Sequence, residues 1–163
     1  MSFYLQVKNI NGSVTTKGHE QWIKLNSFDF DTQRNIFVKP GHVSDRECGI
    51  PNITDFIITK EVDKASPYLF EASLTGVSLG AAFIDVCGSS DDSNKYLQYV
   101  LSDVIISRYN INGIDNDKVI EKPLETLHLN FTKIETKYIP RNSDNKPLSP
   151  IGAGYNIETA TKI

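Results

Sequence analysis

The stretch Asp63-Lys64-Ala65-Ser66-Pro67-Tyr68-Leu69 decides the fold class, because it is the one plausible helix start in a chain otherwise patterned as strands. Ser66 can accept a hydrogen bond from a free amide of the first helical turn, and Pro67 suits the first helical position, which needs no donor. Gly76 then supplies a natural helix stop. We therefore expect one short α-helix, over about residues 65–75, flanking a body of strands.

Strands are predicted on both sides of this helix. Phe3, Leu5 and Val7 occupy every second position of a first strand, the pattern of a strand buried on one face. Stretches rich in β-branched and aromatic residues continue the β character along the chain. Further strands are predicted over residues 21–30, 34–39, 53–62, 77–87, 96–111 and 127–138, with a final edge strand or a mobile tail around residues 154–157.

Two of the predicted strands change phase partway along their length. The apolar positions of residues 21–30 change face near residues 26–27, and those of residues 127–138 change face near residues 132–133. A β-bulge at each place would explain the change, because one extra residue resets which side chains point inward. Strands of this kind let a sheet curl and close. The pattern predicts a mainly β fold, a small β-barrel or tightly bent sandwich of two packed curled sheets, in one domain over residues 1–163.

Bulk composition excludes several classes of function. The chain has 163 residues, of which 39% are hydrophobic and 23% charged, and its formal net charge is -3. These values are typical of a globular protein, and they offer no basic stripe for nucleic acid. The N-terminus lacks the pattern of a signal peptide, and no apolar stretch is long enough to cross a membrane. We expect synthesis in the cytoplasm and no membrane insertion.

Residues with catalytic or metal-binding chemistry are scattered. His19, His42 and His128 are isolated in sequence, and Cys48 and Cys87 do not form a C-x-x-C motif. We interpret the cysteines as two unrelated thiols, with a disulfide or a composite zinc site as the minor alternatives. No serine lies in a nucleophile-elbow motif, and no glycine-rich phosphate loop is present. The sequence therefore predicts a protein that is not an enzyme and uses no cofactor or metal.

Five blocks of sequence, in order along the chain, resemble the Hcp (haemolysin-coregulated protein) family, the tube proteins of bacterial type VI secretion systems. The G-H-E-x-W run is the most specific of them, and the order of all five strengthens the resemblance. The blocks are KGHEQWI at residues 17–23, DKASP at residues 63–67, LSDVIIS at residues 101–107, LHLNFTKI at residues 127–134 and GYNI at residues 154–157.

The resemblance implies a hexameric ring of β-barrels, in which residues 1–163 form a single Hcp-like domain with no fused effector domain. Rings of this family stack into an inner tube that a contractile sheath expels beneath a spike protein, and the ring lumen carries or chaperones effectors. The implied partners are other copies of the chain, the spike, the sheath, baseplate components and secreted effectors. The implied location is the cytoplasm before firing, followed by secretion without a signal peptide. A monomeric β-barrel that binds a ligand or carbohydrate is the alternative.

A long loop is predicted over residues 40–51, which are bounded by prolines and carry mixed charges. Loops of this length inside compact domains are usually functional or disordered. Together with the resemblance, this predicts that the loop and the C-terminal segment contact neighbouring subunits or stacked rings. The residues expected at these contacts are Pro40, Gly41, His42, Val43, Asp45, Arg46 and Glu47.

Overall fold

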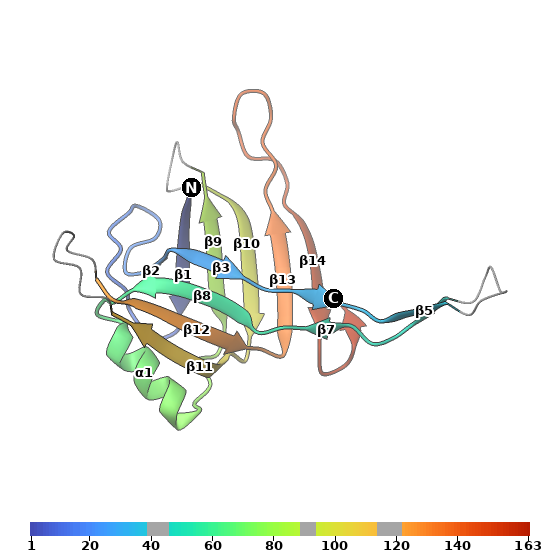
Figure 1. Cartoon of the computed structure of the whole chain (residues 1–163). Helices are drawn as coiled ribbons and strands as arrows, with labels where there is room; N and C mark the ends of the chain where they lie inside the picture. Colours follow the sequence, from blue (N-terminus) through green and yellow to red (C-terminus); the bar gives the residue numbers. More distant parts are fainter. Residues whose placement is uncertain (39–45, 89–93, 114–121) are drawn as a thin grey trace.

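A computed structural model describes residues 1–38, 46–88, 94–113 and 122–163 of the chain. Strands dominate these residues, together with one α-helix (Figure 1). In chain order the elements are β1 (Ser2–Val7), β2 (Ile23–Leu25), β3 (Ser27–Asp29), β4 (Thr32–Gln33), β5 (Ile36–Val38), β6 (Arg46–Cys48), β7 (Asn52–Ile53), β8 (Phe56–Glu61), α1 (Ser66–Thr75), β9 (Ala82–Cys87), β10 (Lys95–Ser102), β11 (Ile105–Asn112), β12 (Leu124–Asn130), β13 (Lys133–Tyr138), β14 (Ile151–Asn156) and β15 (Thr161–Lys162).

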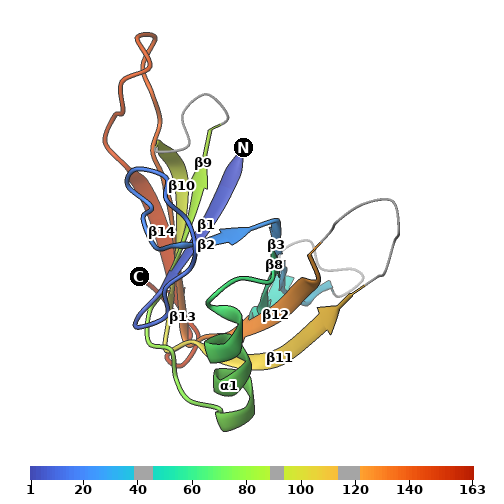
Figure 2. The same ribbon diagram turned by 90° about the vertical axis from the view of Figure 1, so that its left-hand side faces the viewer.

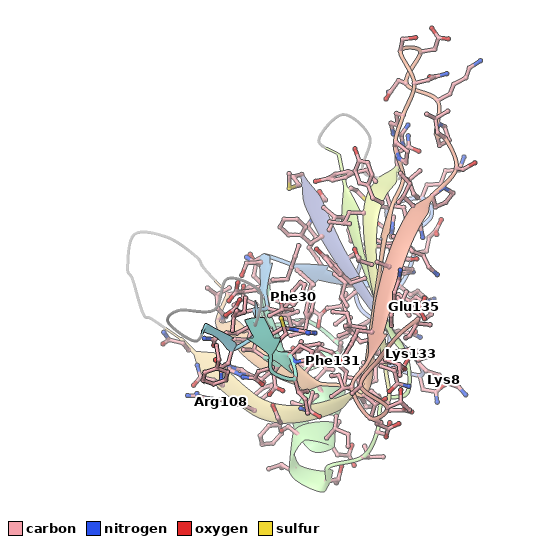
Figure 3. The ribbon with its side chains drawn as sticks, turned by 90° about the vertical axis from the view of Figure 1, so that its right-hand side faces the viewer. Lys8, Phe30, Arg108, Phe131, Lys133 and Glu135 are labelled. Atoms are coloured by element: carbon pink, nitrogen blue, oxygen red, sulfur yellow. The ribbon has the colours of Figure 1, made fainter. Side chains whose placement is uncertain are left out.

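Two antiparallel sheets pack against each other around one apolar core (Figures 1 and 2). The larger sheet has seven strands in the order β15-β14-β13-β10-β9-β1-β2, and the smaller has four in the order β11-β12-β8-β3. Phe30 and Phe131 lie between the sheets (Figure 3). Fully buried side chains of the core come from both sheets and from α1, among them Leu5, Ile23, Phe56, Ile58, Leu69, Ile84, Leu101, Leu127 and Leu129.

The chain passes from one sheet to the other at three short joints between strands. β2 ends and β3 begins around Asn26, and β12 ends and β13 begins around residues 131–132. The predicted changes of phase were therefore at the right places, but the bulges proposed there were wrong. Each change marks a strand that leaves one sheet for the other. The long strand predicted over residues 96–111 also divides, at Asp103, whose φ of 52° turns the backbone between β10 and β11.

The mainly β class with a single short helix is confirmed, but the expected closure into a barrel is wrong for the described residues. β15 and β2 are the two ends of the larger sheet, and β11 and β3 are the two ends of the smaller one. The sheets stay open because these edge strands do not pair with one another, so neither hydrogen-bonded ladder continues around the core. The architecture is a two-layer sandwich with α1 beside one open end (Figure 2).

Helix α1 occupies the predicted position, with one correction at its start. Gly76 ends the helix as predicted, with a φ of 66° and its amide donating to the Ala72 carbonyl. Ser66, however, makes no capping bond and is already the first helical residue, so Pro67 is one position further in than expected. The Ser66 hydroxyl is turned toward a buried carboxylate instead, because a strand beneath the helix presents Glu125 there.

Candidate functional site

The larger sheet extends past the smaller one, and this leaves part of its inner face uncovered. Along β13 the side chain of Ile134 packs against the core, and Tyr138 lies on the same face by strand alternation. Tyr138 is paired with Ile151 of β14. The relative exposures of Tyr138, Leu148 and Ile151 are 49%, 50% and 67%. We call these three residues the overhang patch; Figure 1 shows β13 and β14 beyond the strands of the smaller sheet.

A narrow arm projects from the body beside β14 (Figure 1). Strands β4 and β7 pair at its base, and strands β5 and β6 pair further out. The arm presents Ile36, Phe37 and Ile50 with relative exposures of 56%, 64% and 81%. A two-stranded hairpin is at best marginally stable alone in water. The arm therefore lacks a covering surface within its own chain, and its apolar side chains are available for another molecule.

The structure tests only part of the predicted contact loop. Pro40, Gly41, His42, Val43 and Asp45 lie outside the described residues. Arg46 and Glu47 do not belong to a loop as predicted: they begin β6, where Arg46 pairs with Val38 and Glu47 with Phe37. The backbone hydrogen bonds of an antiparallel pair explain the difference, because they extend the hairpin beyond the residues that look like strand in sequence.

Sequence reasoning missed the exposed apolar residues of the arm and of the overhang patch. Ile36 and Phe37 looked like an ordinary buried strand, and Tyr138 like the end of one. The signal that distinguishes them is the number of strands available to cover each face, which depends on sheet order. The end of the chain is a strand, β14, and not a mobile tail, but β14 is an inner strand: the edge of the larger sheet is the short strand β15.

A row of polar side chains crosses the outer face of the smaller sheet. Ser27, Thr59, Thr126 and Asn110 stand side by side across β3, β8, β12 and β11. Ser27 and Thr59 are joined by a hydrogen bond between their hydroxyls. On the same face of β12 lies His128, which is half-buried. Two apolar residues, Leu124 and Ile57, share this face with the polar row, and Leu124 is 45% exposed.

A fully buried ion pair fixes the start of α1 to the smaller sheet. Lys60 Nζ lies 2.5 Å from Glu125 Oε2, 3.0 Å from Ser66 Oγ and 3.0 Å from Asp63 Oδ1. The other Glu125 oxygen accepts a hydrogen bond from the Tyr109 hydroxyl at 2.5 Å. Burial raises the pKa of Tyr109 above its usual value, and the hydrogen bond and negative charge of Glu125 raise it further. All three donors of the lysine are satisfied, which makes the cluster structural.

His19 is buried in a second polar cluster, on the outer face of the larger sheet. Its ring stacks on Tyr4, and its Nε2 lies 3.0 Å from Asp85 Oδ2 and 3.9 Å from Cys87 Sγ. Both neighbours meet the same ring nitrogen, so the three side chains do not form a proton relay, in which the two partners need opposite nitrogens. Lys95 also contacts Asp85, at 3.3 Å. The cluster secures the β1–β2 connection over the sheet.

Metal binding and membrane crossing find no support in the described ranges. No three His, Cys, Asp or Glu side chains there are arranged to hold a metal ion. Cys48 is exposed and Cys87 is buried, and no disulfide joins them, in agreement with their interpretation as unrelated residues. None of the helices found in those ranges is long and apolar enough to span a bilayer.

Solved structures share this architecture over nearly its whole length. A structure described as a type six secretion system protein superposes with a TM-score of 0.91 at 21% identity and covers 99% of both chains. Hcp1 from Salmonella typhimurium superposes with a TM-score of 0.79 at 20% identity, covering 99% of this chain and 98% of its own. A type VI secretion system effector from Yersinia pestis gives 0.74 at 21% identity, covering 94% and 98%. The fold is that of type VI secretion proteins.

Sequence comparison identifies the family. The family described as "Type VI secretion system effector, Hcp" matches residues 4–138. Protein hcp1 from Pseudomonas aeruginosa is 27% identical over 108 residues, which span 65% of this chain and 65% of that protein. This chain belongs to the Hcp family of type VI secretion system proteins, as its five sequence blocks predicted.

Proposed function

We propose that this protein is a structural subunit of a type VI secretion tube. In this proposal, copies join into a hexameric ring, rings stack into the inner tube that sheath contraction expels, and the lumen carries or chaperones effectors. The partners are other copies of the chain, the spike protein, the sheath and baseplate components, and secreted effectors. The chain resides in the cytoplasm before it is exported. Membership of the Hcp family supports the proposal, and the surfaces of the subunit supply its physical basis.

The overhang patch is the observation that carries the proposal. A sheet with an apolar face is stable when another layer covers that face. The smaller sheet covers one part of the larger sheet and leaves Tyr138 and Ile151 exposed to water. In a ring, the next copy supplies the missing layer. A contact between different faces of identical subunits generates a closed ring when its rotation closes.

The polar face of the smaller sheet is proposed to line the lumen. Its row of hydroxyl and amide side chains, Ser27, Thr59, Thr126 and Asn110, binds water readily. A channel that must release its cargo benefits from weak contacts repeated around the wall. The arm, including the predicted contact residues Arg46 and Glu47, is proposed to join neighbouring subunits or stacked rings.

The experiment is a size-exclusion run with light scattering on the purified full chain. A tube subunit elutes at about six times its chain mass of 18.3 kDa, or as larger stacks. The double variant Tyr138→Ser/Ile151→Ser is expected to elute as a monomer with an unchanged circular dichroism spectrum. Ile105→Ser, an exposed apolar residue away from the overhang patch, serves as the matched control and is expected to assemble.

Two outcomes would contradict the proposal. A wild-type chain that stays monomeric at high concentration would favour the alternative, a monomeric β protein that binds a ligand. Replacement of residues 36–50 by a short Gly-Ser turn tests the arm separately. This variant is expected to keep its folded body while tube formation weakens, and unchanged assembly would remove the arm from the proposal.

A further inference from the structure

A hollow lies between the outer face of the larger sheet and the β1–β2 connection. Leu5 and Val7 pack into the core, so Gln6 between them points to the opposite face of β1. Phe83 of β9 is the direct partner of Gln6 and shares that face. Gln6, Phe83 and residues of the connection together line the hollow, whose volume is about 450 Å³. This volume is within the range of sites that bind small organic molecules.

Side-chain amides dominate the polar part of the lining. They belong to Gln6, Asn9, Asn11 and Gln21, all exposed, and we call the cavity the amide hollow. Within the described ranges, none of these four amides is hydrogen-bonded to another residue. An amide carries an acceptor oxygen and two N–H donors, whereas a hydroxyl group both donates and accepts. Each amide can therefore bond two neighbouring hydroxyl groups, so the amide hollow fits a ligand with many hydroxyls.

An aromatic surface lies beside these amides. Phe83 is half-buried on the outer face of β9, and its direct partner on β10 is the half-buried Val100. Small-molecule sites combine such apolar surface with a few placed polar groups. A sugar ring has the matching composition, because its C–H faces are apolar and its rim carries the hydroxyl groups.

The amide hollow carries no net charge. Lys8 and Glu20 are the charged residues of its lining, one of each sign. Figure 3 shows Lys8 on the outer side of the larger sheet, away from the smaller sheet. The Glu20 carboxylate already accepts a hydrogen bond from the Gly18 amide at 2.9 Å. This balance of charge favours a neutral ligand over an anion such as a phosphate.

The backbone around the amide hollow is held in an uncommon conformation. Asn9 and Gln21 both have a φ of 65°, in the left-handed region that few residues other than glycine adopt. The Gln21 amide donates to the Val14 carbonyl at 2.8 Å, and its carbonyl accepts from the Gly12 amide at 2.7 Å. A side chain added at Gly12 would collide with the Trp22 backbone, so the connection is tightly packed here. Backbone held in this way is frequent at ligand sites.

An extended peptide is a poorer fit than a sugar. Peptides that bind along a sheet usually pair with an exposed strand edge. Strand β1, however, is bonded to β9 on one side and to β2 on the other. The amide hollow therefore offers side-chain amides and an aromatic face, but no free edge of β1.

We infer that the amide hollow binds a neutral saccharide, with one sugar ring stacked on Phe83 and its hydroxyl groups bonded by the four amides. This site goes beyond the proposed function, because it gives a tube subunit a sugar-binding surface. It lies on the face of the larger sheet opposite the overhang patch, so it does not use the surface proposed to join copies.

Calorimetric titration of the purified full chain tests the binding. The ligands are three neutral trisaccharides: maltotriose, cellotriose and chitotriose. At least one is expected to bind with a dissociation constant of about 1 mM or tighter, the weak end of measurable affinity. Trigalacturonate has the same number of rings and three carboxylates. It is expected to bind more weakly than that neutral sugar, because Lys8 alone cannot balance its charge.

Two variants locate the bound saccharide. Gln6→Ala removes one amide and is expected to weaken binding by about fivefold, the effect of one lost hydrogen bond. Phe83→Ala is expected to weaken it by about tenfold, because the stacking surface is lost. Gln33→Ala on β4 and Phe70→Ala on α1 are the matched controls, since both side chains are exposed elsewhere. Both controls are expected to bind like wild type.

Three outcomes would overturn the inference. The first is a chain to which none of the neutral trisaccharides binds. The second is binding that Gln6→Ala leaves unchanged, which would place the saccharide at another surface; because Gln6 is exposed, this variant remains informative even where Phe83→Ala fails to fold. The third is trigalacturonate binding more tightly than every neutral trisaccharide, which would show that the site selects anions.

Discussion

Lys60 and Glu125 form an ion pair to which solvent has no access, and it lies directly beneath the first turn of α1. Lys60 comes from β8 and Glu125 from β12, which are adjacent strands of the smaller sheet. Ser66 of α1 bonds to both side chains. The pair therefore joins the helix to two strands through charge-assisted hydrogen bonds, in a place where apolar packing is interrupted.

Removal of one partner of this pair should strongly destabilise the fold. Lys60→Met leaves Glu125 buried without its counter-charge, a change that typically costs about 3–5 kcal/mol. The double variant Lys60→Met/Glu125→Leu is expected to lose less than Lys60→Met alone, because no uncompensated charge remains. Urea unfolding in the Tyr138→Ser/Ile151→Ser background measures both without a contribution from assembly. Equal losses in the single and double variants would show that the buried charge is not the cause.

Adding a single methyl group at Gly76, the left-handed residue that ends α1, should destabilise the fold measurably. An added Cβ at this position meets no atom within 4 Å, so only the φ of 66° opposes a side chain there. Gly76→Ala is expected to lower the free energy of unfolding by about 1 kcal/mol. Gly88→Ala is the control, because that glycine also has open space but no left-handed φ. Its unfolding free energy should stay close to that of wild type.

Tyr109 should make the fold less stable in strongly alkaline solution. The raised pKa of Tyr109 means that folding favours the neutral phenol over the phenolate. This stabilisation is present below about pH 10, the usual pKa of an unfolded tyrosine, and is lost as the pH rises above it. Unfolding free energies of wild type and Tyr109→Phe, compared at pH 8 and pH 11, should show a smaller decrease in the variant. Tyr68→Phe, on the exposed face of α1, should behave like wild type.

The two thiols should differ in reactivity. Cys48 is exposed on β6, whereas Cys87 is buried at the end of β9. A thiol reagent is expected to label Cys48 rapidly in the folded subunit and Cys87 only after denaturant is added. Mass spectrometry of the labelled peptides gives the two rates. Comparable rates would show that the outer face of the larger sheet opens readily around Cys87.

The strand pattern of the sequence marked places where the chain changes direction. It did not show that the chain passes from one sheet to the other there. The changes of apolar phase near residues 26–27 and 132–133 correspond to joints between sheets, and a bulge would leave the same trace in sequence. The joint at Asp103 had no such signal, because β-branched residues continue on both sides of it. Closure could not be predicted, since it depends on which edges pair.

The sequence predicted the candidate surfaces even less well than the fold. Ser66 was interpreted as a helix cap from local spacing, while its actual partners, Lys60 and Glu125, come from other strands. Phe37 and Tyr138 carry apolar side chains like those of the core, and only the order of strands shows that they lack cover. Sequence reasoning placed Arg46 and Glu47 in a loop because prolines and charges mark a change of structure there, whereas they belong to β6 of the arm.

The three joints at which the backbone passes between the sheets have a mechanical consequence. Force applied to one sheet reaches the other through covalent bonds near Asn26, Asp103 and Thr132, and not only through side chains that can slide past each other. The two layers are joined covalently, so shear along their contact puts the polypeptide itself under tension. Under such a load the layers cannot slip apart before the whole unit yields.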